Sequence, residues 1–218
     1  MRTAYRYWLI SVTISIALIA LGLVELMARR NSPANWYLLN KSVASSAFLT
    51  ILFSYVLSAI HHFWPTFKRG LALRRPLGLS GYVLAVIHVG LTLLVADPKN
   101  LTNKKFPFPE FFIDHWLAML CSIIALAYFT YAFKISVAPA RLRMSAEHTL
   151  LWRKRLRYGY VAVLFVLIHA TLLKFEGWIA WFQTLDPTLP PLSLIVVCLG
   201  IVLIALKSIQ LTRLRRLF

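Results

Sequence analysis

Long apolar segments alternate with short polar connections along the whole chain. An α-helix needs about 20 residues to cross a bilayer, and lipid offers no partners to backbone N–H and C=O groups, so helices are the expected form of each apolar segment. The pattern predicts an all-α polytopic membrane protein, a six-transmembrane-helix bundle in which residues 1–218 form a single domain. The predicted spans are residues 7–27, 43–64, 77–95, 112–133, 157–173 and 192–209.

Composition supports this prediction. The chain is 60% hydrophobic with only 14% charged residues, and its mean hydropathy is +0.71. Soluble domains carry about a quarter charged residues. The net charge of +17 lies in short clusters between apolar segments, not on one polar face, which argues against nucleic acid as a partner. Both cysteines, Cys121 and Cys198, lie inside apolar segments without CxxC spacing, which argues against a disulfide framework or a zinc or iron–sulfur site.

The basic residues predict the orientation of the spans. Of the 24 lysines and arginines, 17 lie in the termini and the even-numbered connections, which share one side of the membrane in a six-span chain. Cytoplasmic connections carry the excess of lysine and arginine, so both termini are expected in the cytoplasm.

Two histidines lie well inside predicted spans. His88 follows the start of the third span by eleven residues, and His169 follows the start of the fifth by twelve. Both spans run from inside to outside, so the two imidazoles lie at similar depths of roughly 17 and 18 Å along the helices. An ionisable side chain within a span is a functional-site hypothesis by default. Two imidazoles at one depth suit the axial ligands of a b-type heme between helices three and five.

Neighbouring residues fit a large flat cofactor as well. Small side chains that leave room for a macrocycle include Gly81, Ala85 and Ala162, and the basic Arg75 and Arg157 suit the heme propionates. The alternative for each histidine is a hydrogen bond across a helix interface, and topology alone explains the basic residues. A similar Thr-Leu-Leu sequence follows each histidine, at Thr92 and at Thr171.

Other histidines lie near predicted span ends or in connections. His61 and His62 end the second span, His115 precedes the fourth helix, and His148 lies in a basic connection. Interfacial histidines need no special explanation, and a structural or solvated role is the simpler interpretation. A second heme near the inner face would use His61 or His62 together with His148.

Two segments carry a family resemblance: Arg74-Arg75-Pro76-Leu77-Gly78 leading to His88, and Trp152 through Arg157 and Tyr160 to Ile168-His169. They resemble the histidine helices of the ferric reductase-like transmembrane domain, with closest similarity to heme-binding membrane subunits of the MsrQ/YedZ type. The resemblance implies heme b held by His88 and His169, in a bacterial inner (plasma) membrane. The chain departs from the family at Leu156 and near Arg75, where relatives carry further histidines, which argues against a standard second heme.

The resemblance also implies partners. Electrons would pass from a flavin reductase or quinol inside to an acceptor outside, so quinone or flavin would enter only through a partner. An enzymatic version would be an oxidoreductase that reduces ferric iron or a small oxidant at the outer face. The alternative is an accessory structural subunit of a larger membrane complex, binding pigment, quinone or lipid. A transporter ranks third, because no broken helix or inverted repeat is evident.

Overall fold

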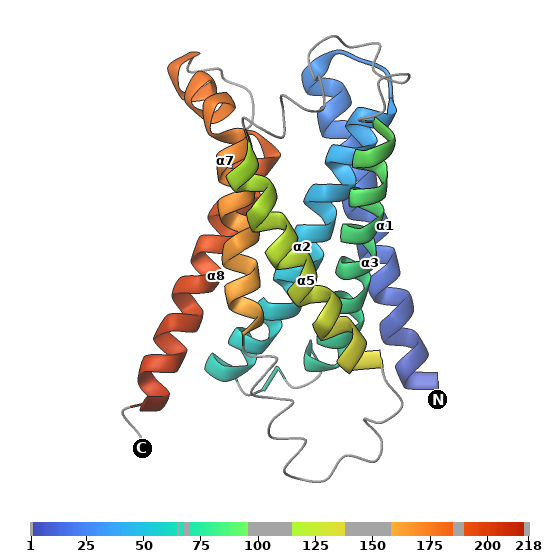
Figure 1. The fold of residues 1–218 in the computed structure, drawn as a ribbon. Coiled ribbons are helices and arrows are strands. Elements are labelled where there is room, and N and C mark those ends of the chain that lie inside the picture. Colours follow the sequence, from blue (N-terminus) through green and yellow to red (C-terminus); the bar gives the residue numbers. More distant parts are fainter. Residues whose placement is uncertain are drawn as a thin grey trace. The chain divides into compact units, whose positions relative to one another are not determined.

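The computed structural model describes residues 2–64, 66–67, 70–95, 115–137, 158–184 and 190–215. All regular secondary structure in these residues is helical, as predicted (Figure 1). Following the labels of Figure 1, the helices are α1 (Arg2–Arg30), α2 (Trp36–Phe63), α3 (Leu71–Val95), α5 (Trp116–Val137), α7 (Gly159–Thr184) and α8 (Leu192–Arg215).

Five of the helices, α1, α2, α3, α5 and α7, are long and apolar enough to cross a membrane, which indicates an integral membrane protein. In α8 the apolar part is shorter and covers Leu192–Leu206. Most helices extend beyond the predicted spans. The largest extension is in α7, which continues to Thr184, eleven residues past the predicted end at residue 173. The polar residues Lys174 and Glu176 do not end a helix, although they do end an apolar pattern.

Local capping explains two of the helix boundaries. At the start of α2, the Asn35 side chain accepts a hydrogen bond from the Leu38 N–H at 2.9 Å, so the helix begins seven residues before the predicted span. At the end of α1, Asn31 has φ 45°, a left-handed conformation that asparagine tolerates, and the Ser32 N–H bonds to the Met27 carbonyl. This is the geometry of a helix C-cap.

The chain forms two compact units. The first comprises residues 1–114 and 186–218, and the second residues 115–185. In the first unit α2 is the central helix and packs against α1, α3 and α8. Of the most apolar stretch of α2, 61% is buried, against 22% or less in the other four potential spans. Figure 1 shows α1 and α3 running in one direction and α2 in the other.

Close packing in the first unit depends on small residues between α2 and α3. A Cβ atom built on Gly81 would lie 2.6 Å from the Ile51 side chain and 3.0 and 3.1 Å from backbone atoms of Ile51 and Ala47. Apolar residues from both helices, including Val43 and Leu84, form a buried cluster beside this contact. The absence of a side chain at Gly81 thus brings the two helices together.

Hydroxyl groups also connect the helices of the first unit. Ser42 donates to the Ile19 carbonyl of α1 at 2.6 Å, and Ser54 donates to the Arg74 carbonyl of α3 at 2.8 Å. Such bonds satisfy polar side chains that would otherwise face hydrocarbon. Ser42 and Ser54 therefore point toward neighbouring helices of the first unit.

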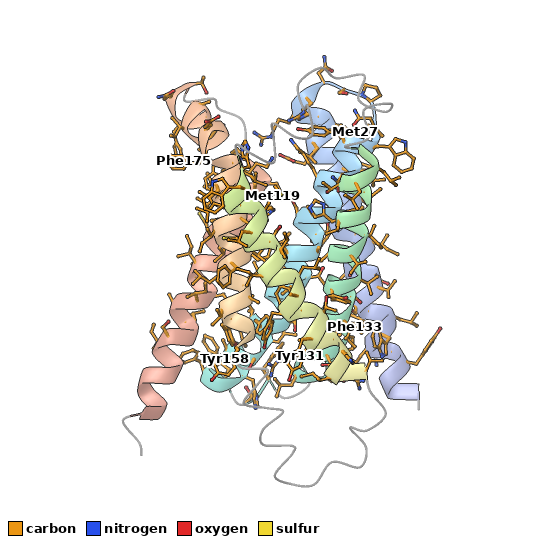
Figure 2. All side chains as sticks on the ribbon, viewed as in Figure 1. Met27, Met119, Tyr131, Phe133, Tyr158 and Phe175 are labelled. Atoms are coloured by element: carbon orange, nitrogen blue, oxygen red, sulfur yellow. The ribbon has the colours of Figure 1, made fainter. Side chains whose placement is uncertain are left out.

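The second unit is an antiparallel pair of helices. In Figure 2, Met119 and Phe175 lie at one end of the pair, and Tyr131 and Tyr158 at the other. The buried residues of α5 recur at intervals of three and four, which places them on one face of the helix. They are Ala118, Cys121, Ala125 and Phe129.

Candidate functional site

His88 lies on α3 in the first unit, beside α2. Its Nδ1 is 2.6 Å from Oδ1 of Asn40, a residue of α2 that is only 9% exposed. The other end of the Asn40 amide, Nδ2, donates to the Thr92 hydroxyl at 3.1 Å. Thr92 in turn donates to the His88 carbonyl at 2.8 Å. His88, Asn40 and Thr92 therefore form a closed network across the α2–α3 interface.

His169 lies on α7 in the second unit, beside α5. Its Nδ1 is 2.8 Å from the main-chain carbonyl oxygen of Ala118. A carbonyl oxygen can only accept, so the ring donates the proton of Nδ1. Ala118 already belongs to a helix, but a carbonyl oxygen has two lone pairs and can accept a second bond. Its side chain is a single methyl group, 1% exposed, and this allows the imidazole to approach the backbone.

In both rings Nδ1 lies within hydrogen-bonding distance of an oxygen atom on a neighbouring helix. In a neutral imidazole with its proton on Nδ1, the basic lone pair is on Nε2, and Nε2 is then the nitrogen that coordinates a metal. Histidines that bind metals almost always donate their second ring N–H to a carbonyl, carboxylate or similar acceptor. The donor set in each unit therefore fits an axial imidazole ligand of heme iron.

The other predicted site residues have separate positions. Gly81 and Ala85 lie on α3 and face α2, Ala85 against the cluster that contains Val43 and Leu84. Ala162 is buried on α7, 3% exposed. Arg75 is exposed on α3. Arg157 and His148 lie outside the described residues, as does the side chain of His62.

His61 was predicted as one alternative ligand of a second heme. It lies near the end of α2, and its Nδ1 is buried without a hydrogen-bond partner among the described residues. His115 lies just before α5. The second heme stays a prediction.

No protein-family model and no curated protein sequence matches this chain. The candidate site is therefore defined by its own geometry.

Sequence reasoning missed two groups that hold the predicted histidines. Asn40 precedes the charged Lys41 and the apolar run that begins at residue 43, so the sequence pattern predicts it outside the second span, whereas the structure has it inside α2. An amide three residues ahead of an apolar run was the available signal, because amides in membrane helices usually bond to a neighbouring helix. The Ala118 carbonyl had no signal, since every residue has a carbonyl group.

Proposed function

We propose that the protein is a b-type cytochrome membrane subunit with the fold of the ferric reductase-like transmembrane domain. In this proposal it crosses a bacterial inner membrane six times, with α8 as the sixth span and both termini in the cytoplasm. It transfers electrons across the membrane through heme bound between α3 and α7. His88 and His169 are the two axial ligands.

The shared state of the two imidazoles carries the proposal. Each ring belongs to an apolar helix, and its Nδ1 hydrogen-bonds to an oxygen acceptor on a neighbouring helix. That bond fixes the orientation of the ring and raises the basicity of Nε2, as it does in other metal sites. Two rings prepared in this way, on helices that run in the same direction in the proposed topology, suit the two faces of one porphyrin.

The remaining residues have supporting roles. Bound heme supplies a one-electron carrier, and the chain supplies ligands, an apolar environment and orientation. Ala162 keeps one side of α7 small, and Arg75 and Arg157 neutralise the propionates. The electron donor is a flavin reductase or quinol at the inner face, and the acceptor, a protein or ferric iron, is at the outer face.

An accessory structural subunit is the second candidate, because the same hydrogen bonds also satisfy the two rings by linking helices. Each bond joins a histidine to an adjacent helix, α2 in one unit and α5 in the other. In that case the histidines stabilise packing between helices and bind no iron.

A visible spectrum separates these candidates. The full chain, purified in a mild detergent from cells supplied with a heme precursor, is expected to show sharp absorption bands that shift when dithionite is added. Extraction of the pigment into alkaline pyridine identifies heme b. A colourless protein with intact helical circular dichroism would support the accessory subunit and refute the cytochrome.

Reporter fusions test the proposed topology. Because the basic clusters favour the cytoplasmic side, a reporter that is active only in the cytoplasm should be active at both termini. The same reporter inserted between α5 and α7 should also be active, whereas one inserted between α3 and α5 should be silent. Activity at only one terminus would mean an odd number of spans.

A further inference from the structure

The contacts of Asn40 determine which nitrogen of His88 carries the proton. Thr92 has one hydroxyl proton and donates it to the His88 carbonyl, so toward Asn40 its oxygen can only accept. The group of Asn40 that faces Thr92 must therefore be the amide NH₂. The opposite end of the amide, the oxygen, then faces the His88 ring.

An amide oxygen has no proton to give. The 2.6 Å contact between Asn40 Oδ1 and His88 Nδ1 is a hydrogen bond only if Nδ1 is the donor. In the neutral ring this leaves the lone pair on Nε2. Each step follows from the previous one, beginning with the hydroxyl of Thr92 and ending with the metal-binding nitrogen of His88.

We infer that Asn40 is a positioning residue for His88, oriented by Thr92, and that it selects Nε2 as the iron-binding nitrogen and tunes its basicity. The inference deepens the proposed function and depends on it. Asn40 does not touch the iron; it acts through the His88 ring. Hydrogen bonding to the axial ligand is one of the means by which proteins adjust heme potentials.

Substitutions of Asn40 and Thr92 either remove the acceptor of the His88 proton, strengthen it or release its orientation, and each has its own expected result. Asn40→Leu removes the acceptor and should weaken heme retention about tenfold, which is the lower end of the effect of losing such a partner. Asn40→Asp keeps the shape and provides a stronger acceptor, so it should lower the midpoint potential of the heme below that of the wild type. Thr92→Val allows the amide to turn, and Thr92→Ser should restore the wild-type state.

Thr50→Val is a matched control. Thr50 is buried in α2 and donates to the carbonyl of Ser46, four residues earlier, as Thr92 donates to the carbonyl of His88 in α3. The control variant should leave the potential and the heme content unchanged.

The deciding measurement uses the heme-depleted full chain, labelled with ¹⁵N-histidine in detergent micelles. Ring ¹⁵N shifts report which nitrogen is protonated, and the His88 signals are identified by their loss in His88→Gln. The wild type and Thr50→Val should show His88 protonated on Nδ1, whereas Asn40→Leu and Thr92→Val should show a mixture of both tautomers. The His169 signals should not change in any of these variants.

Two failures are distinguishable. If His88 keeps its Nδ1 proton in Asn40→Leu and Thr92→Val, or if Asn40→Asp raises the potential, the positioning role is overturned while the cytochrome stands. If the wild type binds no heme, the proposed function falls and the role of Asn40 toward iron falls with it.

Discussion

The α2–α3 pair of the first unit and the α5–α7 pair of the second hold a histidine in the same state by different means. His88 donates its Nδ1 proton to a side-chain amide, and His169 donates to a main-chain carbonyl. An amide can turn and present the wrong group, so it needs a third residue, Thr92, to fix its orientation. A carbonyl group in a helix is already oriented by the backbone, so its bond to His169 depends only on the distance between α5 and α7.

The packing of the two regions differs accordingly. The buried face of α2 includes hydroxyl residues such as Ser42 and Ser46, whereas the buried face of α5 includes small or apolar residues such as Ala118 and Ala125. In the first pair, polar bonds orient side chains across the interface. In the second pair, a row of small residues allows close approach. Substitutions should therefore affect the first pair mainly when they change a hydrogen-bonding group, and the second pair mainly when they change the volume of a side chain.

The largest expected effect tests what the two regions share. His88→Ala and His169→Ala should each remove at least about nine-tenths of the bound heme, because each variant lacks one of the two proposed axial ligands, a larger loss than that of an outer partner. The pyridine extract of the purified protein measures the loss. His148→Ala is the control and should retain its heme. Loss of heme in the control with retention in either ligand variant would reverse the assignment.

Ala118→Leu should specifically disturb the second pair. Its side chain is 1% exposed, so a larger group forces α5 away from α7, and overpacking of this kind costs about 1–3 kcal/mol. The Nδ1–carbonyl bond of His169 should lengthen with it. Ala127→Leu, at an exposed position of the same helix, should have little effect. Thermal unfolding monitored by tryptophan fluorescence measures the change in midpoint. Equal changes in the two variants would contradict the close approach of α5 and α7.

Gly81→Ala tests the corresponding contact of the first pair. The new methyl group would meet backbone atoms of α2 at 3.0 and 3.1 Å, which costs about 1–3 kcal/mol, partly offset by the roughly 1 kcal/mol advantage of alanine over glycine in a helix. In Gly90→Ala, on the same helix, the new methyl group meets no atom within 4 Å, so only the higher helix propensity of alanine affects stability. The difference between their midpoints of SDS denaturation measures the strain. Identical midpoints would mean that Gly81 is not at a tight contact.

Much of the helical fold was predictable from the sequence, because a long apolar segment in lipid has few alternatives to a helix. The two histidines were also predictable, since an imidazole within a span stands out. Their acceptors were not. The Thr-Leu-Leu sequence after each histidine does not indicate the acceptors: Thr92 is four residues after His88 and shares its face, whereas Thr171 is only two residues after His169 and does not. Which groups meet across two helices depends on their packing, and one helix does not encode it alone.

The smallest expected effect concerns the hydroxyl groups of the two regions. Ser54 donates to a carbonyl of the neighbouring helix at 2.8 Å, whereas Ser122 donates to Met119 within its own helix at 2.7 Å. Ser54→Ala should lower the free energy of unfolding by about 0.5–1 kcal/mol, as interhelical bonds in membranes do. Ser122→Ala should change it by less, because its bond does not join two helices. A larger loss of unfolding free energy in Ser122→Ala would show that the second pair also depends on polar bonds. The two pairs would then differ only in how strongly each depends on them.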